Sequence, residues 1–156
     1  MRPAMEVWFY HLQSQRLERA LPALLERASA QGWRAVVQAT SEERLDALDD
    51  VLWTYADASF LAHGRARDGD ADMQPVYLTC EGENPNAARL RLFVDGADVA
   101  ASLTADAAYE RVILLFDGND ADQLASARAQ WKTLKDKGFS LTYWQQNERG
   151  GWEKKA

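Results

Sequence analysis

The sequence predicts a single α/β domain of three layers, in which helices cover both faces of a mostly parallel sheet. Short apolar runs alternate along the chain with longer segments of helical periodicity. Such alternation favours parallel strands, because parallel neighbours need a crossover connection. In addition, residues 111–116 form a nearly continuous apolar run, as expected of a strand that is buried on both faces.

The first half of the chain is expected to form strand, helix, strand and helix in turn, at residues 7–10, 15–31, 35–39 and 40–53. In the first helix, leucine and alanine recur at 3.6-residue spacing, and Gly32 ends it. Thr40 with Glu43 three residues later is a capping-box signature for the second helix. A polar loop follows at 62–71.

The second half is expected to contain four strands and one long helix, with strands at 75–79, 89–94, 111–116 and 139–144. The helix begins after the turn from Asp117 to Asp120 and ends at Gly138. We expect the domain to span residues 1–144. The tail at 145–156 is polar apart from Trp152, so we expect it either to be disordered or to dock through that side chain.

Composition limits the function further. A net charge of -6 and a pI near 4.9 disfavour a protein that grips nucleic acid over a broad surface, because phosphates require a basic field. The single cysteine, Cys80, allows no internal disulfide and is expected to be a buried free thiol. Neither a secretory leader nor a membrane span is recognisable. These features predict a soluble, cytoplasmic protein.

Motifs of the common α/β enzymes are missing from the sequence. No GxGxxG follows the first expected strand, and GxxxxGK[ST] and HExxH occur nowhere. His11 is interpreted as a strand-end histidine that bonds to backbone, with a general base at the sheet edge as the alternative. We therefore expect no cofactor, no metal and no catalytic activity. A nucleotide-dependent α/β enzyme is the alternative.

The last helix carries the clearest sign of a binding surface. Its apolar positions recur at helical spacing and would face the sheet: Leu124, Ala127, Trp131 and Leu134. Beside them, Arg128, Lys132 and Lys135 form a basic stripe. Cations beside a tryptophan suit an acidic peptide with an apolar anchor. The alternative is an ordinary amphipathic helix whose cations complement the helix dipole.

The segment at 52–64, LWTYADASFLAHG, resembles a signature of the chi subunit of bacterial DNA polymerase III. The shared pattern is a leucine-tryptophan pair, a short spacer, serine-phenylalanine, a small residue and histidine. Phe9 and Tyr10 in the first strand, with Arg128 and Trp131 in the last helix, extend the resemblance over about residues 5–144. It implies a Rossmann-like fold without a nucleotide site and an accessory role without catalysis.

The chi-family resemblance also implies a partner for the last helix. That partner is the acidic C-terminal tail of single-stranded-DNA-binding protein, which would enter a pocket between the second and last helices. Trp53, Arg128 and Trp131 carry over as tail contacts. Lys132 and Lys135 would supply the further charge, because Leu124 stands where some relatives have a basic residue.

A second partner follows from the same resemblance. The psi subunit, or another clamp-loader component, would bind at Phe60, Leu61 and His63. Association with single-stranded DNA would then be indirect, and no membrane contact is expected. The alternative is a scaffold subunit that binds no tail.

Overall fold

The structure is a computed structural model that describes residues 6–54, 63–103, 109–149 and 151–156. Its strands are β1 (Glu6–Leu12), β2 (Ala35–Gln38), β3 (Gly64–Arg65), β4 (Val76–Thr79), β5 (Leu90–Phe93), β6 (Arg111–Asp117), β7 (Ser140–Gln146) and β8 (Trp152–Lys154). Its helices are α1 (Leu17–Ala30), α2 (Glu42–Thr54), α3 (Val99–Ser102) and α4 (Ala121–Asp136), with the 3₁₀ turns η1 (Ala66–Asp68) and η2 (Ala71–Met73).

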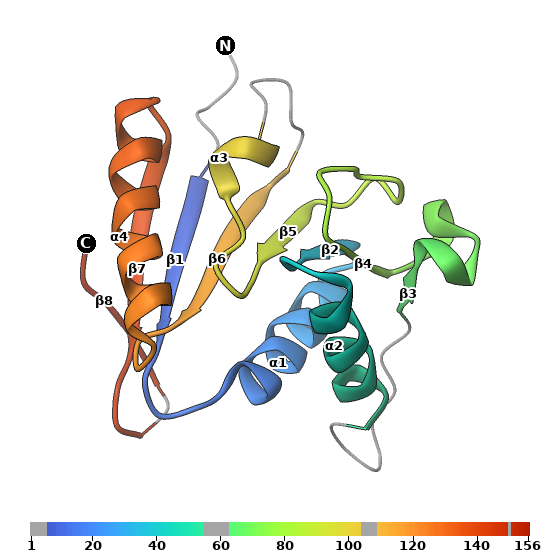
Figure 1. The fold of residues 1–156 in the computed structure, drawn as a ribbon, viewed down its shortest axis with the longest axis horizontal. Helices are drawn as coiled ribbons and strands as arrows, with labels where there is room; N and C mark the ends of the chain where they lie inside the picture. Colours follow the sequence, from blue (N-terminus) through green and yellow to red (C-terminus); the bar gives the residue numbers. More distant parts are fainter. Residues whose placement is uncertain (1–5, 55–62, 104–108, 150) are drawn as a thin grey trace.

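One sheet runs through the described residues in the order β3-β4-β2-β5-β6-β1-β7-β8. Its neighbouring strands pair in parallel, except for β7 and β8, which are antiparallel. Figure 1 shows the helices packed around this twisted sheet. The predicted α/β class with a mostly parallel sheet is therefore confirmed.

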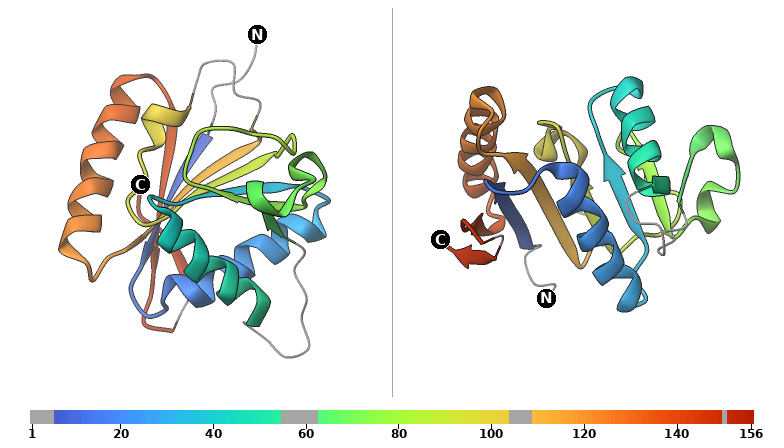
Figure 2. Two further views of the ribbon diagram at one scale, coloured as in Figure 1. Left: turned by 45° about the vertical axis from the view of Figure 1, so that its right-hand side comes forward. Right: turned by 90° about the horizontal axis from the view of Figure 1, so that it is seen from below.

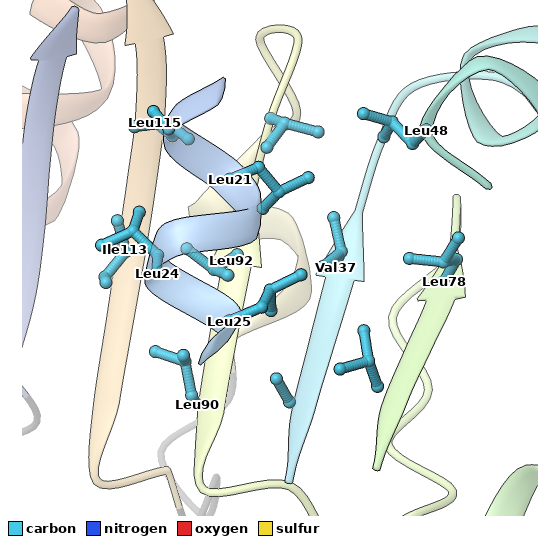
Figure 3. Close-up of a cluster of buried hydrophobic side chains, with 14 of the residues drawn as sticks. Leu21, Leu24, Leu25, Val37, Leu48, Leu78, Leu90, Leu92, Ile113 and Leu115 are labelled. Carbon is cyan, nitrogen blue, oxygen red and sulfur yellow. The ribbon is translucent and has the colours of Figure 1, made fainter. Parts of the chain in front are cut away.

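The two largest hydrophobic clusters lie on opposite faces of the sheet, because successive side chains of a strand point to opposite faces. In β1, Tyr10 and Leu12 enter the core that α1 and α2 cover, whereas Val7 and Phe9 enter the core beneath α3 and α4. Figure 3 shows the first core, where leucines of α1 and α2 meet the side chains of β2, β4, β5 and β6. The sheet therefore separates α2 from α4.

The helices also lie at different positions along the sheet. Helix α2 packs near β4, close to one edge, and α4 packs on β6 and β7, close to the other. Figure 2 shows α2 and α4 apart in both of its views. This placement decides which of the predicted binding residues can act together.

The segment from the start of α2 to β3 differs from the sequence-based expectation. Ser41 caps α2 through a hydrogen bond from the Arg44 amide to the Ser41 hydroxyl (3.3 Å), in place of Thr40. Within the expected polar loop at 62–71 lie β3 and η1, and η2 begins at its last residue. Arg65 ties β3 to α2, because its guanidinium donates to the carboxylates of Asp46 and Glu42 at 2.5 Å each.

The C-terminal segment is part of the sheet. Strand β7 extends to Gln146, and residues 152–154 add β8 as an antiparallel edge strand. The Trp152 ring packs against the ring of Tyr10, with 4.6 Å between their centroids. The sequence left open whether this segment is disordered or docks through Trp152, and in the structure Trp152 docks on the domain.

Candidate functional site

A small apolar pocket with a basic rim lies on α4. Its volume is about 280 Å³, and its lining consists of Leu124, Ala127, Arg128, Trp131, Tyr143 and Ala156. We call this set the α4 pocket. Helix spacing brings its first four members to one side of α4, because residues three and four apart share a helix face. The other two come from β7 and from the segment after β8.

Aromatic packing fixes the floor of the α4 pocket. The Trp131 ring meets the rings of Phe9 and Tyr143 edge to face, at centroid distances of 5.1 and 5.8 Å. Phe9 is fully buried in β1, and Tyr143 lies beside it on β7. Such edge-to-face pairs add to the stabilisation from burial itself. Trp131 is therefore held in place by the sheet and remains only partly buried.

One wall of the pocket comes from the chain beyond β8. The Lys155 amide donates to the Tyr143 carbonyl (2.8 Å), and the Tyr143 amide donates to the Ala156 carbonyl (3.2 Å). These two bonds continue the pairing of β7 with β8 and bring Ala156 to the pocket. The position of this wall depends on strand pairing across the sheet edge.

The Tyr143 hydroxyl has a partner behind the pocket. His11 Nδ1 lies 2.7 Å from Tyr143 Oη. Burial lowers the pKa of His11, the charge of Arg128 lowers it further, and Asp117 opposes both. Burial raises the pKa of Tyr143, against the effect of Arg128. Arg128 thus acts electrostatically on both members of the pair, while His11 bonds to a side chain and not to backbone as expected from the sequence.

Three cations stand at the rim of the pocket or next to it. Arg128, Lys132 and Lys135 are exposed on α4, and none of them forms an ion pair with a carboxylate of the described residues. Arg128 lines the pocket itself, whereas the two lysines do not. An unpaired cation at an apolar pocket is a suitable receptor for a carboxylate attached to an apolar side chain.

Trp53 lies elsewhere. It is on α2, with 55% of its surface exposed, and its ring contacts that of His63 at a centroid distance of 4.8 Å. His63 Nε2 in turn lies 2.7 Å from Asp49 Oδ1. We call Asp49, Trp53 and His63 the α2 surface. Phe60 and Leu61, expected at the same contact, lie outside the described residues.

The expected single pocket between the second and last helices is therefore corrected by the structure. Arg128 and Trp131 lie together, with Lys132 and Lys135 on the adjoining part of α4. Trp53 lies on the opposite face of the sheet, because α2 packs on the core of α1 and α4 packs on the other core. The physical reason is the strand order, which places β4 and β7 near opposite edges.

Comparison with known families identifies the family of this chain. The family model for the DNA polymerase III chi subunit, HolC, matches residues 5–142. The chain belongs to the chi-subunit family. It is also similar to a protein of Rickettsia prowazekii (strain Madrid E) described as probable DNA polymerase III subunit chi, with 28% identity over 111 residues that cover 69% of this chain and 67% of the relative. Membership makes the chain an accessory subunit of DNA polymerase III.

The loop after β1 differs from the phosphate-binding loop of dinucleotide-binding folds. In dinucleotide-binding folds the amides of this loop point at the phosphates. Here the Gln146 carboxamide oxygen accepts from the amides of Gln13, Ser14 and Gln15, at 3.2, 3.1 and 2.9 Å. Gln146 is fully buried, so these amides are satisfied within the fold.

A larger cavity of about 760 Å³ lies beside this loop, at the carboxyl ends of the central strands. Its charged lining is mixed, with Arg16 and Arg44 opposite Asp95 and Asp117. Arg44 and Asp95 pair with each other at 2.8 Å. The described residues contain no group of three histidine, cysteine or acidic side chains that could hold a metal ion, and none of the described helices could span a membrane.

Sequence reasoning does not identify Tyr143 as a pocket residue, because it is one position of an expected strand. It singles out His11, but as a base or a backbone-bonded residue and not as the partner of Tyr143. The parallel register of β1 and β7 pairs Phe9 with Tyr143 and sets His11 beside it. A sequence signal exists only in the alternation of β7, which places Leu141 and Tyr143 on the same face.

Proposed function

We propose that this chi-family chain links the clamp loader of DNA polymerase III to single-stranded-DNA-binding protein. The α4 pocket would bind the acidic C-terminal tail of that protein, and the α2 surface would bind the psi subunit or another clamp-loader component. The chain itself would have no catalytic activity, act in the cytoplasm and meet single-stranded DNA only indirectly.

The observation that carries the tail-binding role is the combination of an apolar pocket with an unpaired cation. A phenylalanine side chain at the end of a tail fits against Trp131, Leu124 and Ala127. Its carboxylate would meet Arg128, and the acidic residues before it would pass Lys132 and Lys135. A charge-assisted hydrogen bond contributes about 1.5–3 kcal/mol, whereas micromolar affinity corresponds to about 8 kcal/mol, so several such contacts together with the apolar anchor would be needed to reach it.

The second role is supported by the composition of the α2 surface. The exposed indole of Trp53 lies on the buried imidazole of His63, which Asp49 holds. Tryptophan is enriched among the residues that contribute most to the binding energy of protein interfaces. Because the α2 surface and the α4 pocket lie on opposite faces of the sheet, both partners could be bound at once.

Titration with a short acidic peptide that ends in phenylalanine tests the tail-binding role. At low salt we expect micromolar binding by the unmodified chain and a loss of about ten- to hundredfold in Arg128→Ala. Arg19→Ala is the matched control, because Arg19 is an exposed arginine on α1 and its removal changes the net charge equally. Unchanged binding by Arg128→Ala would refute this site.

The scaffold alternative predicts a different result. A chain whose only partner is another subunit would not bind the peptide at any salt concentration. It would still be captured by a clamp-loader component through the α2 surface.

A further inference from the structure

His11 and Tyr143 form a hydrogen-bonded pair whose outer member lines the α4 pocket. The His11 ring is confined on its far side, because a Cβ atom added at Gly118 would come within 1.8 Å of His11 Nε2. It also lies against the Phe116 ring at a centroid distance of 5.0 Å. The imidazole therefore cannot leave the Tyr143 hydroxyl without a rearrangement of the turn after β6.

The pair can hold its hydrogens in two ways. In one, the Tyr143 hydroxyl donates to His11 Nδ1, so its oxygen has only lone pairs left for a further partner. In the other, His11 Nδ1 donates to Tyr143 Oη, so the hydroxyl hydrogen is directed elsewhere. A protonated imidazole has only the second arrangement open to it, because both of its nitrogens carry hydrogens.

A carboxylate in the pocket selects the second arrangement. It accepts hydrogen bonds only, so it gains from a hydroxyl that donates and is repelled by one that presents lone pairs. Protonation of His11 favours the same arrangement. The positive charge of Arg128 disfavours a second positive charge on His11. A bound carboxylate would offset the charge of Arg128 and so favour protonation of His11.

We infer that His11 is a positioning residue of the α4 pocket, which orients the Tyr143 hydroxyl so that binding of a tail carboxylate is coupled to protonation of His11. This inference rests on the proposed tail-binding function and adds a regulation to it. Four groups from the surrounding elements set the coupling. Tyr143 of β7 bonds to the ring, Asp117 at the end of β6 favours the protonated form, Arg128 of α4 opposes it, and Gly118 confines the ring.

The direction of the pH effect follows from linkage. In the absence of tail, burial and Arg128 lower the pKa of His11, so the imidazole is neutral near neutral pH. Binding of a carboxylate raises that pKa, and binding must then strengthen as the pH falls. Each unit of increase in the pKa corresponds to a gain of about tenfold in affinity at low pH. Above the pKa of the bound state the effect is lost.

Titration of the acidic peptide between about pH 5.5 and pH 8 tests the inference, because this range brackets ordinary histidine titration. We expect the affinity of the unmodified chain to fall as the pH rises. His11→Asn keeps a polar group near Tyr143 that does not titrate, so its affinity should be independent of pH. Tyr143→Phe should bind more weakly and also lose the pH dependence.

A second measurement uses the unmodified chain, in case a variant fails to fold. Nuclear magnetic resonance of labelled histidine gives the titration curve of His11 without peptide and at saturation. We expect the curve to move to higher pH on saturation, while that of His63 serves as the reference from the opposite face. Binding without a shift of the His11 curve would overturn the inference alone. No binding at any pH would overturn the proposed function as well.

Discussion

The two ends of the sheet differ in how their basic side chains are paired with carboxylates. Next to the α2 surface, Arg65 is held by Glu42 and Asp46, and Asp49 holds His63. At the α4 pocket, Arg128 and its neighbours on the helix have no carboxylate partner among the described residues. The first end thus offers a tryptophan against a histidine that a carboxylate holds, and the second offers cations beside an apolar pocket.

This difference shows how a chain with a net charge of -6 could attract the acidic tail proposed above. Overall charge acts at long range and is screened over about 8 Å at physiological salt. Within that distance, the local pattern on α4 decides. The acidic excess of the chain is placed partly on α2, where it is used to hold β3 and His63.

The largest expected effect is on tail binding by the charge-reversing substitution Arg128→Glu. It replaces an attraction with a repulsion at the pocket, so we expect a loss of more than about a hundredfold in affinity for the acidic peptide. Fluorescence anisotropy with a labelled peptide measures it. Arg19→Glu on α1 is the control, and equal losses in both variants would mean that only net charge matters.

The next effect is on stability and concerns the α2 surface. His63→Ala removes a buried imidazole that bonds to Asp49 and supports the Trp53 ring. We expect the free energy of unfolding to fall by about 1–3 kcal/mol, because the Asp49 carboxylate loses a hydrogen-bond partner. Chemical denaturation measures it. Peptide binding at the α4 pocket should survive, and its loss would show that the two ends are not independent.

The two surfaces should also differ in how strongly salt affects their binding affinity, although this effect is smaller than the two above. Raising the salt concentration weakens exposed charge pairs, so tail-peptide affinity should fall several-fold between about 0.05 and 0.5 M salt. Association through the α2 surface should change little, since its charges are already paired and its main contact is apolar. Parallel titrations with the peptide and with a clamp-loader component test this. The same salt dependence in both would contradict the distinction.

The smallest effect is expected for Trp53→Ala in peptide binding. Trp53 lies on the opposite face from the α4 pocket, so tail affinity should stay within about twofold of the unmodified chain. Capture by a clamp-loader component should fall strongly, because an exposed tryptophan is removed from the centre of that surface. Isothermal calorimetry with the peptide distinguishes the outcomes. A large loss of peptide affinity in Trp53→Ala would mean that Trp53 contacts the tail after all.

The sequence located most elements to within a few residues, because periodicity and end signals are local properties. The long helix after Asp120 is an example, since Asp120 caps it by accepting from the amides of Asp122 and Gln123. Strand β3 and helix α3 were missed, because two to four residues are too few to show a period. Strand β8 was missed because its three residues are too few to show the alternation of a strand.

For the candidate site, the sequence by itself determined that Arg128 and Trp131 lie together, because three residues along a helix nearly complete a turn. Family resemblance suggested the proposed partner but not the geometry. Only the tertiary structure decided that Tyr143 and Ala156 complete the pocket, that His11 bonds to Tyr143 behind it, and that Trp53 does not belong to it. Those relations depend on strand order and register, which join residues more than a hundred positions apart, and no local pattern specifies them.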